Sequence, residues 1–294
     1  MSGAPGSAEG RRELRFDTAP DLRRIYASAL VAGRASSGPL PDVLAVRLEV
    51  RADADTVADY ARVCGFPVRS TLPLTYPHVL AFPLQTAIMS QREFPLALMG
   101  SLHVENVITA TRPIGLDEAF DLTVHAENLR PHRRGRQVDL VSEATVAGET
   151  VWRGVSTYLS RGEDHPDATT SEPPDLQPLQ AVAAGPTWRF AEDVGRRYAR
   201  VSGDWNPIHV HALTARPLGF PTSIAHGMYS YARVVAALGP RIPDAGVTSH
   251  VWFRKPLRLP STVRLRSEFE ANRALSLLSS AKADVQHAII EHRW

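Results

Sequence analysis

The stretch Tyr198-Ala199-Arg200-Val201-Ser202-Gly203 repeats, with one substitution, an earlier stretch of the same chain, Tyr60-Ala61-Arg62-Val63-Cys64-Gly65. The two copies are 138 positions apart. Three further matches keep this separation: Asp55 with Asp193, Phe82-Pro83 with Phe220-Pro221, and Ala87 with Ala225. Self-similarity at a fixed separation is typical of a duplicated structural unit. The pattern therefore predicts two copies of one fold within the 294 residues.

Residues 161–185, between the copies, have the composition of a linker. Four prolines and several acidic residues favour extended backbone and disfavour a packed core. We therefore place an N-terminal extension at 1–40, a first domain at 41–160, the linker at 161–185 and a second domain at 186–294.

Both halves show the same order of predicted elements. A short helix, at 54–63 and again at 191–201, has Asp55 or Asp193 in its first turn, where a carboxylate suits the helix dipole. An apolar helix follows, which in the second half covers Gly227 to Leu238. Alternating residues then predict strands at 122–127, 137–145, 150–159, 249–254, 262–269, 275–283 and 287–293. This order is typical of an α+β fold with an antiparallel sheet wrapped around the helix, and residues 21–34 predict one more helix.

Composition and charge exclude several classes of protein. The net charge is +2, and the basic residues are mixed with acidic ones, so nucleic acid is not the expected partner. The densest basic run, 130–136, is predicted to be a solvated hairpin turn. Cys64 is the single cysteine, which excludes an intrachain disulfide and fits a reducing compartment. Residues 1–20 lack the apolar core of a secretory signal and no stretch is apolar over the length of a membrane span, so we expect a cytoplasmic protein.

The segment Ser202-Gly203-Asp204-Trp205-Asn206-Pro207-Ile208-His209 carries the candidate chemistry. It places a carboxylate, an amide and an imidazole within six residues around Gly and Pro, a composition that predicts a loop. The segment 220–228 leads into the apolar helix, where the first backbone N–H groups have no acceptor within the helix. Asp204 and His209 are a candidate general acid/base pair, Asn206 is a supporting amide, and the Gly227 N–H is a candidate oxyanion donor. Addition of water to an enoyl thioester needs these groups, because water must be activated, C2 must receive a proton and the thioester oxygen must be stabilised.

Simpler interpretations exist for each of these residues. Asp and Asn cap turns, so a purely structural role is the alternative for Asn206. His209, His211 and His226 with Asp204 form a candidate metal site, but their spacing matches no usual zinc pattern and no metal is expected. His211 and His226, taken singly, are more typical of hydrogen-bonded structural histidines. The glycine-rich dinucleotide motif, the Walker loop and the serine-hydrolase elbow are absent from the sequence, and no cofactor is expected.

The run from Tyr198 to His209, followed by Ala225-His226-Gly227-Met228, resembles the signature of MaoC-like (R)-specific enoyl-CoA hydratases, also called hydratase 2. The whole chain resembles the two-hotdog (3R)-hydroxyacyl-thioester dehydratases of actinobacteria, the X type, with the segments 73–77 and 127–135 carrying that nearer likeness. The resemblance implies a double hotdog fold with an inactive first half. It implies reversible hydration of trans-2-enoyl thioesters, with CoA or acyl carrier protein as the thioester carrier. It also implies a homodimer, and that Asp204 and His209 are catalytic, that Asn206 supports them and that the Gly227 N–H holds the thioester oxygen.

The first half departs from this pattern. At the separation of 138, Phe66, Val68 and Thr71 correspond to Asp204, Asn206 and His209, and Met89 corresponds to Gly227. The acid/base pair is therefore missing from the first half. Its apolar residues predict a wall of the acyl tunnel, with Ile88 and Met89 as candidates, and the same residues are also compatible with core packing. We place His226 and Lys255 beside them as candidate substrate-binding residues.

Two other functions fit a hotdog chain. A hotdog thioesterase carries a carboxylate on its central helix, whereas the segment from Gly227 to Leu238 contains neither Asp nor Glu. A non-catalytic acyl-thioester-binding module fits the first half alone, but not the intact motif of the second half. An assay with a trans-2-enoyl-CoA distinguishes the three functions. A hydratase hydrates it with the thioester intact, a thioesterase releases free thiol, and a binding module does neither.

Overall fold

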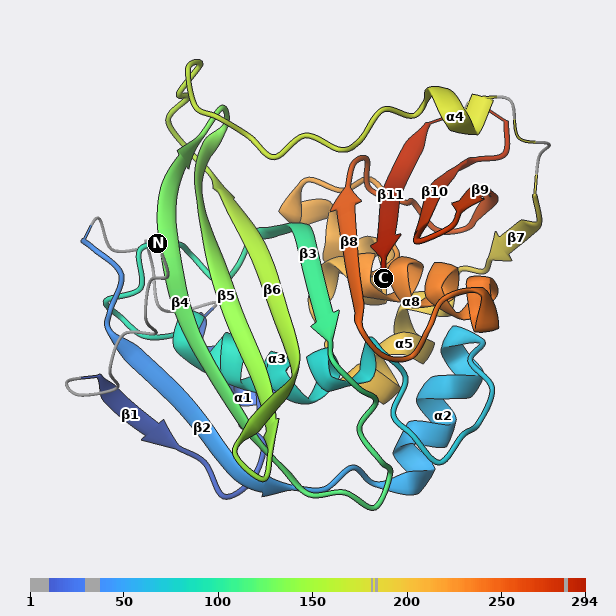
Figure 1. The fold of residues 1–294 in the computed structure, drawn as a ribbon. Coiled ribbons are helices and arrows are strands. Elements are labelled where there is room, and N and C mark those ends of the chain that lie inside the picture. Colours follow the sequence, from blue (N-terminus) through green and yellow to red (C-terminus); the bar gives the residue numbers. More distant parts are fainter. Residues whose placement is uncertain (1–10, 30–37, 181, 183–184, 283–284) are drawn as a thin grey trace.

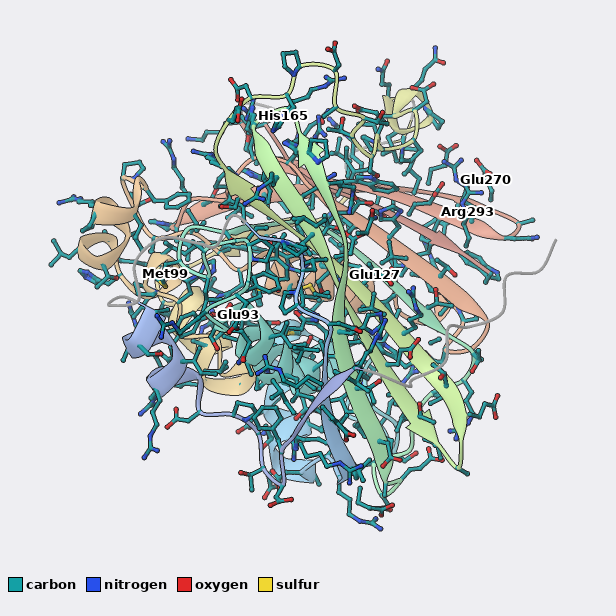
Figure 2. All side chains as sticks on the ribbon, turned by 90° about the vertical axis from the view of Figure 1, so that its left-hand side faces the viewer. Glu93, Met99, Glu127, His165, Glu270 and Arg293 are labelled. Atoms are coloured by element: carbon teal, nitrogen blue, oxygen red, sulfur yellow. The ribbon has the colours of Figure 1, made fainter. Side chains whose placement is uncertain are left out.

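The computed structural model describes residues 11–29, 38–180, 182, 185–282 and 285–294 (Figure 1). All eleven strands of this part belong to one sheet, in the order β1-β2-β4-β5-β6-β3-β8-β11-β10-β9-β7. Apart from the parallel pair β1–β2, every neighbouring pair is antiparallel. Figure 2, turned by 90°, shows the strands of both halves on one side of the molecule and the main helices on the other. The predicted α+β class is confirmed.

The first half wraps its strands around one long helix, α3 (Tyr76–Met89). Twelve of the fourteen residues of α3 are buried, so almost its whole surface packs against protein. The remaining elements are β1 (Arg12–Arg15), α1 (Leu22–Ala29), β2 (Val43–Val50), α2 (Ala54–Cys64), β3 (Leu102–Ala110), β4 (Phe120–His132), β5 (Gly135–Val146) and β6 (Glu149–Arg161).

The second half repeats this arrangement around α8 (Gly227–Leu238), the central helix predicted from the sequence. Its other elements are α4 (Gln177–Gln180), β7 (Thr187–Phe190), α5 (Val194–Ser202), α6 (Pro207–Val210), α7 (Ala212–Ala215), the 3-10 turns η1 (Arg216–Leu218) and η2 (Gly239–Arg241), β8 (Val247–Phe253), β9 (Ser261–Glu270), β10 (Arg273–Ser280) and β11 (Gln286–Arg293).

The two halves are joined at the middle of the sheet by β3 and β8 (Figure 1). These strands pair from Glu105 with Trp252 to Ala110 with Val247. Each half thereby covers the exposed edge that the other would present. The two copies thus form one continuous sheet within a single chain.

The seven predicted strands all exist, and most extend beyond their predicted ends, while residue 283 lies outside the described part of the chain. Four strands were missed. Strands β1 and β7 are only four residues long, and β2 and β3 carry charged or polar residues that blur their alternation. The N-terminal helix is confirmed over Leu22–Ala29, and residues 30–34 of its predicted range lie outside the described residues.

The repeated hexapeptide packs the two halves against each other. It forms the ends of α2 and α5, where the buried rings of Tyr60 and Tyr198 lie 6.1 Å apart. Gly65 and Gly203 end these helices with φ angles of 82° and 74°, the left-handed conformation that glycine adopts without strain. Asp55 lies in the first turn of α2 as predicted. The second helix starts three residues later than expected, with Asp193 as its N-cap residue.

The constant separation of 138 ends at Gly203. The same backbone hydrogen bond is found just before the central helix of each half. In the first half, Leu72 N–H donates to the carbonyl of Ile114, which follows β3 (2.9 Å). In the second half, Ala225 N–H donates to the carbonyl of Leu257, which follows β8 (2.8 Å). Leu72 and Ala225 are 153 positions apart, so the second half contains 15 extra residues here.

This insertion holds α6, α7 and η1, and with them the candidate catalytic segment. The predicted pairing of His209 with Thr71 is therefore wrong, because Thr71 bridges to Gly115 as Ile224 bridges to Arg258. Phe66 follows Gly65 as Asp204 follows Gly203, so the first half has no carboxylate at that place. The pairing of Met89 with Gly227 is also wrong, since Met89 ends its central helix whereas Gly227 begins the other. The match of Phe82-Pro83 with Phe220-Pro221 is coincidental, because the first pair lies within α3 and the second in a loop.

Residues 162–180, which follow β6, pass along the ends of the strands at the top of Figure 1 and end in α4. This segment contains little regular structure, but Leu179 of α4 is buried in a small cluster with Trp252, Leu275, Leu277 and Ile289. The segment forms no core of its own, as its composition predicts, but two leucines among its prolines give it an apolar contact with the sheet.

His292 on β11 makes the stability of the protein sensitive to acid. Its side chain is fully buried, and within the described residues neither ring nitrogen has a hydrogen-bond partner. Burial lowers the pKa of His292 to about 3. Below about pH 6.5 the unfolded chain therefore binds more protons than the folded chain. For each unit by which the pH falls, the free energy of unfolding decreases by up to about 1.4 kcal/mol.

We expect His292→Leu to raise the melting temperature at neutral pH and to flatten its decline between about pH 6.5 and pH 4, because an unsatisfied buried imidazole is replaced by an apolar side chain. Thermal unfolding followed at a series of pH values measures both effects. Parallel curves for the variant and the wild-type protein would show that His292 does not contribute to acid sensitivity.

Candidate active site

Asp204 follows the end of α5 and is held by three groups. Its Oδ1 accepts hydrogen bonds from the Tyr26 hydroxyl (3.0 Å) and from the backbone N–H of Asn206 (3.1 Å). Its Oδ2 lies 3.7 Å from Nε2 of His226. The carboxylate is only 19% exposed, and the two donors on Oδ1 leave Oδ2 as the oxygen available to a ligand.

His209 lies on α6, a single turn that starts at Pro207, so the predicted loop ends two residues before the histidine. Its Nδ1 is 2.9 Å from the carbonyl oxygen of Ile224. A carbonyl oxygen only accepts hydrogen bonds, so Nδ1 carries the proton and Nε2 keeps a free lone pair. Burial lowers the pKa of His209, and the nearby charge of Asp204 partly offsets this effect. At neutral pH the imidazole is therefore uncharged and able to accept a proton.

His226 is the N-cap residue of α8 and stacks on His209, with ring centroids 3.7 Å apart. Its Nε2 donates to the backbone carbonyl of Asp204 (2.9 Å), and this bond joins the candidate catalytic segment to the central helix. Burial, reinforced by His209, lowers the pKa of His226 to about 3. One ligand atom each of Asp204, His209 and His226 lies within 4.8 Å of the others, so the predicted acid/base pair is assembled together with a second histidine.

Gly227 is the first residue of α8, where its N–H has no acceptor within the helix. A Cβ atom at this position would lie 2.9 Å from the ring of Phe253, so a side chain here would displace that ring. Glycine therefore allows Phe253 to lie directly against the helix N-terminus and to cover the site from the sheet side.

Two of the remaining predicted residues, Asn206 and Lys255, have more peripheral places. Asn206 is the N-cap residue of α6, and its Oδ1 accepts from the Ile208 N–H (3.3 Å). This is the turn-capping role considered above, and it fixes the backbone that carries His209. Lys255 lies exposed on the chain after β8, together with Arg254 and Arg258.

The first half supplies side chains that the sequence did not indicate. Tyr26 of α1 reaches Asp204 across 178 positions of sequence. Burial lowers the pKa of His78 of α3 to about 4, and the charge of Asp204 partly offsets this effect. Burial raises the pKa of Tyr158 of β6, and the charge of Asp204 adds to this effect. Both side chains therefore lie close to Asp204. His103 of β3 stacks between Tyr158 and His78 (4.7 and 5.7 Å), and its ring lies 5.1 Å from that of Phe253. The wall that the first half contributes is therefore aromatic and partly polar here, not simply apolar as expected.

Ile88 and Met89 lie at the C-terminal end of α3, and both are buried in the main core. Met89 is eleven residues after His78, which places the two on the same face of the helix, about 16 Å apart at 1.5 Å per residue. Ile88 points to a different face. The two candidates are thus not equivalent, and only Met89 shares the helix face that leads to the site.

Comparison with known proteins identifies the family. Residues 167–288 match the MaoC-like domain. The 3-hydroxyacyl-thioester dehydratase X of Mycobacterium tuberculosis is 40% identical over 259 residues, which cover 85% of this chain and 92% of that protein. The (R)-specific enoyl-CoA hydratase of Rhodospirillum rubrum is 41% identical over 69 residues, 22% of this chain and 48% of that protein.

The crystal structure of HtdX from Mycobacterium tuberculosis agrees with the present structure at a TM-score of 0.75 and 37% identity, covering 85% of this chain and 99% of that one. A MaoC-like dehydratase from Phytophthora capsici shares the fold, with a TM-score of 0.71 and 17% identity. The chain belongs to the MaoC-like dehydratases and has their double hotdog fold. The resemblance found in the sequence is confirmed.

Proposed function

We propose that this protein is a hydro-lyase that interconverts trans-2-enoyl thioesters and (3R)-hydroxyacyl thioesters. The observation that carries the proposal is the arrangement of Asp204 and His209 beside the N-terminus of α8, with one ligand atom of each within 4.8 Å. Relatives named 3-hydroxyacyl-thioester dehydratase, 3-hydroxybutyryl-CoA dehydratase and (R)-specific enoyl-CoA hydratase support it. The chemistry belongs to the second half, because the first half lacks the segment that carries the acid/base pair.

In the hydration direction, one water molecule lies between Asp204 Oδ2 and His209 Nε2. The pair removes a proton from this water as its oxygen bonds to C3 of the enoyl group. The electrons of the double bond move toward the thioester oxygen, which the Gly227 N–H stabilises. The proton held by the pair is then delivered to C2. Hydroxyl and hydrogen are thereby added across the double bond, and the pair returns to its starting state.

A trans-2-enoyl-CoA mixed with the purified protein tests the function. A hydratase removes the absorbance of the conjugated enoyl thioester without releasing thiol, and the product is the (3R)-hydroxyacyl-CoA. Free thiol would instead indicate a thioesterase, and binding without either change would indicate a non-catalytic module. Helix α8 contains no Asp or Glu, which argues against the thioesterase.

We propose that the carrier of the acyl group is CoA or acyl carrier protein and that His226 and Lys255 belong to the substrate-binding residues. Lys255 is exposed beside Arg254 and Arg258, and the carbonyl of Leu257 in the same segment accepts a hydrogen bond from Ala225, next to His226. Exposed cations at this place suit the phosphates of either carrier. No helix among the described residues is long and apolar enough to cross a membrane. A cytoplasmic location and a homodimer complete the proposal, and light scattering tests the dimer.

The acyl tunnel gives a matched pair of variants at the end of α3. We expect Met89→Trp to lower kcat/KM for long enoyl-CoAs and to spare crotonyl-CoA, since each methylene excluded from an apolar pocket costs about 0.8 kcal/mol. Ile88→Trp, on another face of the helix, is expected to lower the melting temperature and to affect all chain lengths equally. Kinetics over a chain-length series and thermal unfolding measure both. A uniform loss for Met89→Trp would remove this residue from the tunnel.

The cluster of Asp204, His209 and His226 also resembles a set of metal ligands. Each histidine already donates one ring N–H to a backbone carbonyl, His226 through Nε2 and His209 through Nδ1. Only one nitrogen of each ring is therefore left for a metal. We expect hydratase turnover to be unchanged after treatment with a chelator and dialysis. Loss of turnover that added zinc restores would assign the cluster to a metal instead.

A further inference from the structure

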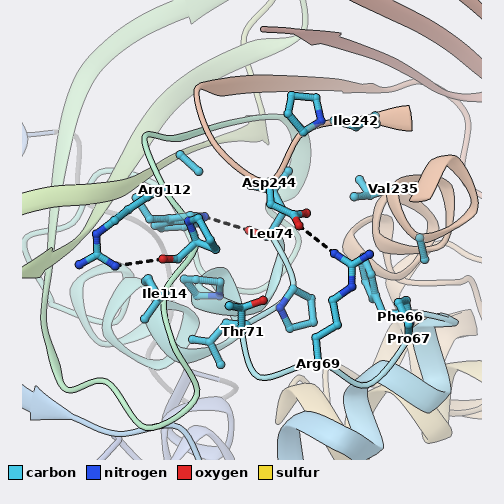
Figure 3. Close-up of a pocket in the computed structure, with 18 of the residues that line it drawn as sticks. Phe66, Pro67, Arg69, Thr71, Leu74, Arg112, Ile114, Val235, Ile242 and Asp244 are labelled. Atoms are coloured by element: carbon cyan, nitrogen blue, oxygen red, sulfur yellow. Dashed lines mark hydrogen bonds and ion pairs between the residues drawn. The ribbon is translucent and has the colours of Figure 1, made fainter. Parts of the chain in front are cut away.

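The first half contains a cavity at the place that corresponds to the active site of the second. The cavity offers about 80 Å³ to the centre of a water-sized sphere, and it lies between the start of α3, the chain after β3 and the C-terminal end of α8 (Figure 3). Leu72 and Ile114 line it, and their backbone hydrogen bond corresponds to that of Ala225 and Leu257 beside the catalytic residues. The cavity is therefore the counterpart of the acyl-thioester site in the duplicated fold.

The lining of this cavity provides binding surface without chemistry. It is formed mostly by apolar side chains, including Leu74, Ile114, Trp152 and Val235. In the second half the central helix starts with the free N–H of Gly227, whereas α3 has Pro77 in its first turn and follows Pro73, and neither proline has an N–H. A thioester oxygen would find no equivalent donor from these two residues.

The mouth of the cavity carries charge. Arg69 forms an ion pair with Asp244 (2.8 Å) that links the loops of the two halves across the opening, as Figure 3 shows. The two side chains are 43% and 63% exposed, so a ligand carboxylate can take the place of Asp244 on the guanidinium. An apolar cavity with an arginine at its mouth suits a hydrocarbon chain that ends in a carboxylate.

We propose that this cavity binds a fatty acyl group, with the chain in the cavity and the carboxylate at Arg69, and that it does so without turnover. The site is separate from the catalytic cluster and lies on the opposite side of the pseudo-symmetric pair of halves.

Isothermal titration with dodecanoate tests the proposal on the intact protein. Ala236 is half-buried on α8 and lines the cavity, whereas its neighbour Ala237 is exposed. Ala236→Phe is expected to weaken dodecanoate binding at least tenfold, and Ala237→Phe is expected to leave it unchanged. Crotonyl-CoA turnover is expected to be unaffected in both variants, which also shows that they are folded.

A second variant keeps the test decisive if Ala236→Phe does not fold. Arg69→Ala is expected to weaken binding of dodecanoate several-fold and to leave binding of 1-dodecanol, which has no carboxylate, unchanged. Three outcomes would each overturn the proposal: no binding to the wild-type protein, equal binding by Ala236→Phe and wild type, or complete displacement of dodecanoate by crotonyl-CoA, which would assign the binding to the catalytic site.

A different observation supports a second inference, which rests on the proposed function. Helix α1 lies over the catalytic loop: Leu22 approaches Gly203, Arg23 lies 5.7 Å from the ring of Trp205, and Tyr26 bonds to Asp204. Burial and the charge of Asp204 raise the pKa of Tyr26, so its hydroxyl remains a donor at any working pH. We infer that Tyr26 is a positioning residue that fixes Asp204 Oδ1 and directs Oδ2 toward the substrate.

Tyr26→Phe is expected to lower kcat about tenfold to a hundredfold with little change in KM or in melting temperature, because Oδ1 of Asp204 loses the hydroxyl that holds it. Arg23→Ala, on the same helix, is the matched control and is expected to keep the wild-type kcat. A lower kcat accompanied by a lower melting temperature would reduce Tyr26 to a packing residue, and a wild-type kcat would overturn the inference. Activity of the wild-type protein, measured alongside, separates either result from a failure of the proposed function.

Discussion

Replacement of Asp204 by Asn or of His209 by Gln is expected to lower kcat for hydration of a trans-2-enoyl-CoA by about 10²- to 10⁴-fold, the range that general acid/base groups contribute. Each change keeps the size of the side chain and removes its ability to exchange a proton. The fold is expected to remain, because Asp204 is partly exposed and the Nδ1–H bond of His209 to Ile224 can be made by the glutamine amide. Steady-state kinetics with circular dichroism measures both.

His211 provides the matched control for these variants. It is exposed, lies two residues after His209 and caps α7 through its Nδ1. His211→Asn keeps a capping side chain, so turnover close to that of the wild-type protein is expected. Near-normal turnover in Asp204→Asn or His209→Gln would remove that residue from the mechanism.

The pH profile of the wild-type protein gives a further check on His209. Burial holds its pKa below the ordinary histidine value of 6.5, so the residue becomes protonated only in acid. A protonated imidazole cannot accept the proton of water. The acid limb of kcat/KM is therefore expected to lie below about pH 6.5, with full activity at neutral pH. A limb above that value would contradict the assignment of an uncharged His209 as the base.

Gly195→Ala is expected to have the second largest effect, although this residue touches no substrate. Gly195 is buried on α5, and a Cβ atom there would overlap the backbone carbonyl oxygen of His209 on α6. The overlap involves backbone, so α6 has to move and the imidazole moves with it. A misplacement of about 1 Å in a catalytic group can cost about 10²-fold in rate.

The comparison of kcat, KM and melting temperature separates this effect from simple unfolding. Alanine favours the helix over glycine by about 1 kcal/mol, so the helix itself gains stability in the variant. Arg197→Ala, an exposed change two residues along the same helix, is expected to have normal kcat. A normal kcat in Gly195→Ala as well would show that α6 accommodates the methyl group and that its position is not critical.

Local patterns determined much of this protein. The hexapeptide ending in Gly65 and Gly203 predicted a duplication, because a buried tyrosine and a left-handed glycine leave a recognisable spacing at the end of a helix. The central helix α8 was predicted within its observed bounds, because its apolar residues recur at helical spacing. Asp204 and His209 were found because they lie five positions apart in one segment.

Only the tertiary structure decided what surrounds that pair. Tyr26 is 178 positions from Asp204, and no periodicity relates the two residues. The role of Gly195 depends on the approach of α6, and the role of Gly227 on the ring of Phe253. The 15 extra residues of the second half broke a register that looked constant in the sequence, and thereby misplaced Met89. The physical reason is that helix capping and side-chain periodicity involve residues a few positions apart, so a short stretch of sequence determines them. Contacts between the two halves depend instead on how the whole halves pack.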